Sequence, residues 1–135
     1  MSSLSIFQLA GSAMHAQSTR LNTVASNLAN VESVSGDPAT VYKPREPRFQ
    51  AYQIGDNSAQ QGVRVTGVQE SQAAPIKRYE PGHPKADAEG YIYAPPIDPV
   101  AQMVNMISAS RSYQSSVEML NTAKDLAIAT INVGR

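Results

Sequence analysis

The sequence predicts a mainly α-helical protein with a small, irregular β insert, in which long N- and C-terminal helices pair as an antiparallel coiled coil. Apolar residues recur in steps of three and four near both ends of the 135-residue chain, which is typical of helices. All nine prolines and six of the eight glycines lie within residues 36–99, which excludes a continuous helix there. We therefore expect a discontinuous helical domain, residues 1–33 and 98–135, around an insert, residues 34–97.

The first predicted helix spans residues 4–31 and carries a heptad seam of about four repeats. The seam consists of Phe7, Ala10, Met14, Gln17, Leu21, Val24, Leu28 and Val31. Asn27 and Asn30 lie near its end, although Asn is roughly half a kcal/mol less favourable than Ala in a helix interior. Two explanations stay open. Either a partner in an assembly satisfies these side chains, or Asn30 is a left-handed C-cap and Asn27 faces water.

The insert contains four short runs with the composition of β-strands, at residues 48–54, 63–71, 76–79 and 91–93. Gly62 and Gly67 suggest turns or bulges around the second run. This segment is therefore expected to form a small and irregular β structure.

The second long helix is predicted over residues 98–132. Asp98 is a suitable N-cap, and Pro99 at the first helical position suits the missing N–H and the fixed φ of proline. Gly134 follows the last apolar residue and is expected to end the helix. A broad apolar stripe runs along it: Met103, Met106, Ile107, Tyr113, Val117, Leu120, Ala127, Ile128 and Ile131.

Both predicted helices also carry many Ser and Ala residues, and residues 4–31 contain a single charged side chain, Arg20. Ser is not a strong helix former, and the charged pairs of a solvated helix are scarce here. We therefore expect the faces made of small residues to meet other chains. They include Gly11, Ala16, Ala25 and Ala29 in the first helix and Ser108, Ala109, Ser115, Ser116, Ala123 and Ala129 in the second.

Two sets of residues are predicted to make the important contacts. Pairing of the two helices within one chain is assigned to Leu21, Val24 and Leu28 with Val117, Leu120 and Ile131. Contacts between subunits are assigned to Asn27, Asn30, Arg111, Tyr113 and Asn121. For two of the latter an alternative stays open: Arg111 could form a surface salt bridge, and Tyr113 could be a core ring.

The composition points away from catalysis and from nucleic-acid binding. Eleven basic and eleven acidic residues give a formal net charge of zero, without the basic cluster that phosphate backbones attract. There is no cysteine, His15 and His83 lack metal-ligand spacing, and no nucleophile elbow or phosphate loop occurs. The nearby carboxylates Glu80, Asp87 and Glu89 suit turn formation and N-capping. We expect no catalytic residue, metal or cofactor.

The chain also lacks an apolar run long enough for a transmembrane helix, and its N-terminus has no basic region followed by an apolar core. We therefore expect neither a membrane span nor a cleaved secretory signal. If the protein leaves the cytoplasm, it uses a route that does not read that signal.

Three stretches, in the correct order, resemble the axial proteins of the bacterial flagellum, which are its rod and hook subunits. "LNTVASNLANVES" (21–33) resembles their N-terminal motif, and "RSYQSSVEMLNTAKDLAIATINVGR" (111–135) resembles their C-terminal helix. "YEPGHPKADAEGYIYAPPIDPVAQMVNMISASRSYQ" (79–114) resembles the proximal rod subunit most closely. The sequence departs from the usual pattern at Ser26, Pro96 and Ser116, where family members often have Asn.

This resemblance implies a structural subunit and not an enzyme. Such a subunit leaves the cytoplasm through the flagellar type III export apparatus without a cleaved signal and assembles in the periplasm. It polymerises through its terminal helices, links the membrane ring to the distal rod and transmits torque. Its partners would be copies of itself, neighbouring rod proteins, and a membrane-ring or export-gate adaptor. The alternatives are another rod or hook subunit, or a soluble coiled-coil adaptor that forms no polymer.

Overall fold

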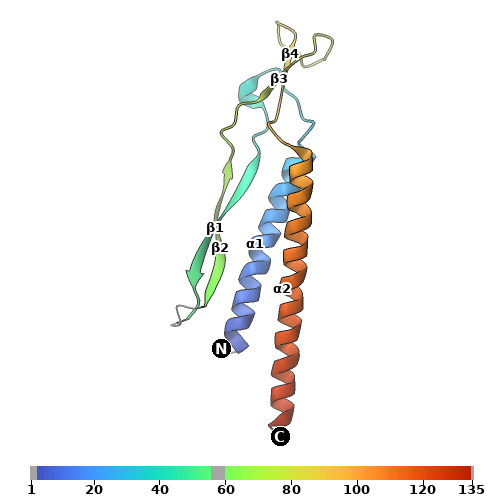
Figure 1. Ribbon diagram of the computed structural model, residues 1–135. Helices are drawn as coiled ribbons and strands as arrows, with labels where there is room; N and C mark the ends of the chain where they lie inside the picture. The colour runs from blue at the N-terminus through green and yellow to red at the C-terminus, as the bar shows by residue number, and fades with distance from the viewer. Residues whose placement is uncertain (1–2, 56–59, 135) are drawn as a thin grey trace.

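The computed structural model describes residues 3–55 and 60–134, and it is elongated (Figure 1). Two long helices lie side by side and run in opposite directions, and a β-hairpin lies along the first helix. A smaller hairpin lies at the end where the first helix finishes and the second begins. The elements are α1 (Ser3–Ala29), a 3₁₀ turn (Pro38–Thr40), β1 (Arg45–Gln53), β2 (Gln61–Glu70), β3 (Ile76–Tyr79), β4 (Tyr91–Ala94) and α2 (Pro99–Val133).

The ends of α2 lie where the sequence predicts them. The Asp98 carboxylate accepts hydrogen bonds from the backbone N–H groups of Val100 and Ala101, and Pro99 occupies the first helical position. At the other end, the N–H of Gly134 donates to the carbonyl of Thr130. Local capping chemistry is therefore sufficient to define both ends of this helix.

The end of α1 differs from the left-handed cap considered above. The helix ends at Ala29, and no non-glycine residue in the described ranges has a positive φ. The Asn30 side-chain amide instead donates to the Ser26 carbonyl at 2.8 Å. This bond satisfies one of the free carbonyls at the helix end, so Asn30 caps α1 with its side chain and needs no left-handed backbone.

The strands form two separate antiparallel pairs, β1 with β2 and β3 with β4, close to the predicted ranges. In the longer pair Arg48 faces Gly67 while Phe49 faces Val65, so Thr66 is an extra residue in a β-bulge. The bulge expected near Gly67 is therefore confirmed.

Gly62 lies inside β2 and serves a different purpose from the turn or bulge suggested for it. It is buried, and a Cβ there would lie 2.8 Å from Ile54 Cδ1 and 3.0 Å from Ser12 Oγ. Glycine thus allows the far end of the hairpin to approach α1 closely.

The short hairpin joins the segment after α1 to the start of α2. Ser35 forms an isolated antiparallel bridge with Tyr93, and Ile92 of β4 is completely buried. On the exposed face, the rings of Tyr79 and Tyr91 meet edge to face with centroids 5.1 Å apart, and the Lys77 ammonium lies 3.8 Å from the Tyr91 centroid. These cross-strand contacts stabilise a sheet of only two strands.

The Asp87 carboxylate organises the loop between β3 and β4. Its Oδ1 accepts hydrogen bonds from the N–H groups of Glu89, at 2.9 Å, and Tyr91, at 2.8 Å. The bond from Tyr91, with smaller contributions from Glu89, Tyr93 and Lys77, lowers the pKa of Asp87 below its ordinary value of 3.8. The expected use of this carboxylate in turn formation is confirmed.

We expect replacement of Asp87 by Asn to destabilise the protein in a pH-dependent way. Because the pKa of Asp87 is lower in the folded than in the unfolded chain, its ionised form contributes stability above pH 3.8, and this is lost as the pH falls through the folded pKa. In urea unfolding, the wild type should have a higher free energy of unfolding than Asp87→Asn at neutral pH. This difference should disappear in acid. A difference that persists unchanged in acid would contradict this assignment, and exposed Glu89→Gln is the control.

We also expect Gly36→Ala to destabilise the packing of this loop against the segment after α1. A Cβ at Gly36 would lie 2.5 Å from the carbonyl oxygen of Lys85, so one backbone must move, at a cost of about 1–3 kcal/mol. Gly82→Ala is the matched control, because its Cβ would meet no atom within 4 Å. Equal urea midpoints for the two variants would show that the contact is not rigid.

Candidate functional site

The region where α1, α2 and β1 meet is held by the side chain of Asn27, which is 2% exposed. Its Oδ1 accepts hydrogen bonds from the backbone N–H of Arg45 at 2.8 Å and the hydroxyl of Tyr42 at 3.0 Å. Its Nδ2 donates to the Arg45 carbonyl at 2.9 Å and, at 3.4 Å, to Gln102 of α2. Asn27 was predicted to contact other subunits or to face water, and both expectations are wrong. Its hydrogen bonds all lie within the chain.

Other polar side chains at the end of α1 are also satisfied within the chain. The Thr23 hydroxyl donates to the carbonyls of Arg20 and Thr19, and Ser26 shares a 2.9 Å hydrogen bond with the Tyr42 hydroxyl. The Arg20 guanidinium donates to Asn105 Oδ1 of α2 at 2.8 Å. The bonds of Arg20 and Ser26 attach α1 to its neighbours, whereas those of Thr23 stay within α1. Together they offset the unfavourable helix propensity of this stretch.

The contact between the two helices is made largely by small side chains. Ala109, Ser116 and Ala123 are the buried residues of α2, and Ala10 and Ala16 are buried on α1. The expectation that small residues meet other chains is therefore corrected for Ala16, Ala109, Ser116 and Ala123, because they are buried within the chain and allow α1 and α2 to approach each other. Ala10 belongs to the predicted heptad seam, and it is buried. The seven-residue spacing of Ala109, Ser116 and Ala123 is the sequence signal that could have revealed this.

The residues predicted to pair the helices have different environments. Val24 is 5% exposed, while Leu21, Leu28, Val117 and Leu120 are half-buried. The C-terminal end of α2 extends beyond the start of α1 (Figure 1). Ile131 is the third-last residue of α2, and it is 69% exposed. The prediction for Ile131 is corrected, because α2 has 35 residues and α1 has 27.

The remaining residues predicted to contact other subunits lie on several parts of the surface. Arg111 and Asn121 are exposed on α2, and Asn30 is half-buried at the end of α1. Tyr113 is half-buried and lies four residues after Ala109, which favours the alternative of a packed ring.

Large apolar side chains are exposed on the side of α2 opposite to the buried small residues. Four of them lie at the spacing i, i+3, i+4 and i+7 near the start of the helix and form what we call the apolar stripe. The stripe consists of Val100, Met103, Val104 and Ile107, which are 67%, 51%, 61% and 55% exposed. Its spacing is that of a helix face that packs against a partner.

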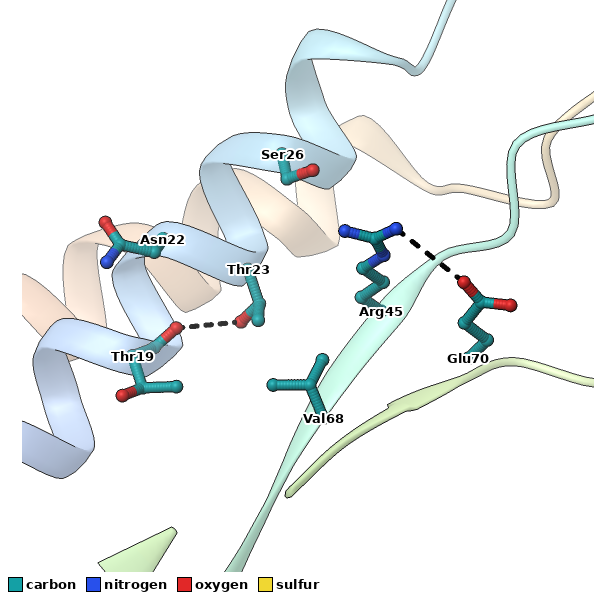
Figure 2. Close-up of a pocket in the computed structure, with 7 residues that line it drawn as sticks. All are labelled: Thr19, Asn22, Thr23, Ser26, Arg45, Val68 and Glu70. Atoms are coloured by element: carbon teal, nitrogen blue, oxygen red, sulfur yellow. Dashed lines mark hydrogen bonds and ion pairs between the residues drawn. The ribbon is translucent and has the colours of Figure 1, made fainter. Parts of the chain in front are cut away.

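A groove of about 490 Å³ separates α1 from the long hairpin (Figure 2). Thr19, Asn22, Thr23 and Ser26 line it from α1, and Arg45, Val68 and Glu70 line it from the hairpin. At its edge, Arg45 Nη2 lies 3.7 Å from Glu70 Oε1, and both side chains are about half exposed. Such an exposed ion pair between the ends of β1 and β2 contributes little stability.

The described residues carry no candidate metal site. Within residues 3–55 and 60–134, no three His, Asp or Glu side chains form a group that could hold a metal ion. Neither described helix is long and apolar enough to cross a membrane.

Comparison with known proteins agrees with this arrangement. Residues 7–36 match the family described as "Flagella basal body rod protein", and residues 88–133 match "Flagellar basal body rod FlgEFG protein C-terminal". The chain is 49% identical to the flagellar basal-body rod protein FlgC of Escherichia coli O157:H7, over 100% of both chains. It is 48% identical to FlgC of Salmonella typhimurium, again over 100% of both, and 39% identical to FlgC of Buchnera aphidicola from Acyrthosiphon pisum, over 98% of each.

These similarities define a structural protein of the flagellar basal-body rod, and such proteins are not enzymes. Within this class, the chain belongs to the FlgC family. Membership implies assembly with other components of the rod.

We expect Ala109→Leu to disrupt the contact between the helices. Ala109 has no exposed surface, and the extra methylene groups would force the helices apart at a cost of about 1–3 kcal/mol. Ala129→Leu, at an exposed position of the same helix, is the control. Urea unfolding monitored by far-UV circular dichroism should show a lower midpoint for Ala109→Leu alone, and equal midpoints would contradict the assignment of this seam.

Proposed function

We propose that this chain polymerises through its two long helices in the proximal rod, where it links the membrane ring to the distal rod and transmits torque. Residues 1–33 and 98–135 would form the axial core, and residues 34–97 would project from it. The subunit would be exported without a cleaved signal. It would contact copies of itself, neighbouring rod proteins, and a membrane-ring or export-gate adaptor.

The apolar stripe is the observation that carries this proposal. Its four side chains are each more than half exposed, although burial of each would contribute about 1.5–3 kcal/mol. Further along α2, Leu126 and Ile131 are also 63% and 69% exposed. A helix with this surface is more stable when another chain covers it.

The total surface area also supports assembly. The accessible surface is 8872 Å², whereas a compact monomer of 14.5 kDa would expose about 6,900 Å². The excess of about 2,000 Å² is comparable with a complete protein–protein interface, which buries roughly 1,200–2,000 Å². The chain is therefore extended enough to meet several neighbours.

Within each subunit, we propose that α1 and α2 form an antiparallel coiled coil. The three buried residues of α2, spaced by seven, are consistent with one half of its heptad seam, and half-buried Tyr113 and Leu120 alternate with them. Val24 provides a buried residue on α1. This arrangement leaves the opposite face of α2 free for a neighbouring subunit.

Among the predicted subunit contacts, Arg111 and Asn121 remain the strongest proposals. Arg111 follows Ile107 by four residues and thus continues the apolar stripe with a charged end. Asn121 follows Met103 by five helical turns, so it lies on the same side of α2. Asn30 is a weaker proposal because its amide already caps α1.

The double substitution Val104→Asp with Ile107→Asp should abolish swimming when it replaces the wild-type chain in cells. Two carboxylates would be buried without partners in the assembled rod, and an uncompensated buried charge costs about 3–5 kcal/mol. The free chain should unfold at nearly the wild-type urea midpoint, because both positions are mostly exposed.

The control is Gln72→Asp in the exposed loop before β3, which should swim normally. Normal swimming of the double variant would overturn the proposed role of the stripe. Sedimentation of the wild-type chain as a sharp monomer that never joins the rod would favour the non-polymeric adaptor instead.

A further inference from the structure

We infer that Asn27 is a positioning residue that fixes the angle between the long hairpin and the helix pair, so that both meet neighbouring subunits as one rigid unit. The fixed angle itself follows from the structure, and its importance for assembly rests on the function proposed above. The inference starts from the number and direction of the hydrogen bonds that this one side chain makes.

The Asn27 amide uses its full hydrogen-bonding capacity. A side-chain amide has two N–H groups and one oxygen with two lone pairs. Here the oxygen accepts from Arg45 and Tyr42, and the NH₂ group donates to Arg45 and Gln102. Only one orientation of the amide fits two donors and two acceptors in these places.

The paired bonds to Arg45 resemble those between neighbouring strands. Arg45 is the first residue of β1, and on its other side it pairs with Glu70 of β2. The side chain of Asn27 thus takes the place of a third strand at the first residue of β1. Because Gln102 belongs to α2, the same side chain attaches the start of the hairpin to both helices.

Few other polar contacts hold the hairpin to α1 within the described residues. At its far end, the N–H of Val63 donates to Ser12 Oγ at 3.2 Å, close to buried Gly62. Between this point and Asn27 lies the open groove, to which Val68 is the only large apolar contributor (Figure 2). The angle of the hairpin therefore depends strongly on the attachment at Asn27.

Aspartate cannot replace Asn27 in this role, although it has nearly the same shape. Its carboxylate has no N–H to give to the Arg45 carbonyl, and one of its oxygens would face that carbonyl. Alanine would leave both backbone groups of Arg45 without their partner on this edge. Asn27→Asp and Asn27→Ala therefore remove the attachment in two different ways.

The angle can be measured by pulsed electron paramagnetic resonance with two spin labels. Because the chain has no cysteine, Thr19→Cys and Val68→Cys would carry the only labels, one on each side of the groove (Figure 2). We expect a narrow distribution of the distance between the labels in the doubly labelled protein that retains Asn27. Asn27→Ala and Asn27→Asp should broaden or shift it, while far-UV circular dichroism shows the helices intact.

Val24→Ala is the control for a general loss of stability. Val24 is 5% exposed, so its truncation should lower the urea midpoint without changing the distance across the groove. If Asn27 only stabilised the fold, its variants and Val24→Ala would behave alike. If Asn27→Ala fails to fold, Tyr42→Phe, which removes one of the four bonds, takes its place and should also broaden or shift the distribution.

An unchanged distribution in a folded Asn27 variant would overturn the inference, and so would a broad distribution in the doubly labelled protein that retains Asn27. Swimming separates this inference from the proposed function. If the proposed function is wrong, the apolar-stripe double variant swims, whereas the Asn27 variants still change the distance. If only the positioning role is wrong, the stripe variant fails to swim and the Asn27 variants leave the distance unchanged.

Discussion

The structure depends on the close approach of two antiparallel helices through small side chains. Alanine and serine at the contact bring the helix backbones near each other, and the buried polar groups of α1 then reach partners on α2 and β1. The same choice has a cost. Small residues bury little apolar area, so the pair by itself gains limited hydrophobic stabilisation. Several of the larger apolar residues of α2, among them those of the apolar stripe, are instead exposed.

Because the buried residues between the helices are small, hydrogen bonds contribute much to the orientation of the parts of the subunit. Where apolar packing is thin, a fully satisfied buried amide such as Asn27 determines how the parts are oriented, because leaving its groups unpaired would be expensive. The long hairpin is likewise attached by few polar contacts. It is bonded to both helices through Asn27 at one end and to α1 through Ser12 at the other, with a groove between these points.

Much of this fold could be predicted from local chemistry. Asp98, Pro99 and Gly134 define the ends of α2 through contacts within a few residues. The β-strands are recognisable from their composition and from the prolines and glycines that separate them. The contact surfaces were harder. Periodicity identifies a helix but does not say which of two apolar faces turns inward. Hydrophobicity favours large side chains as the contact residues, whereas the structure buries Ala109 and Ser116.

The site around Asn27 was missed for a related reason. Its partners Tyr42, Arg45 and Gln102 lie 15, 18 and 75 residues away in the chain, so no local motif reveals them. An asparagine within a heptad pattern indicates a satisfied amide, and it leaves open whether the partner belongs to the same molecule.

The unequal lengths of α1 and α2 give the subunit an asymmetry along its long axis. The eight additional residues of α2, 35 against 27, extend it by about 12 Å at 1.5 Å per residue. At one end the chain closes on itself through the short hairpin, and at the other a single helix projects without its companion. In the assembly proposed above, a neighbouring subunit would therefore meet a single exposed helix at one end and a closed hairpin at the other.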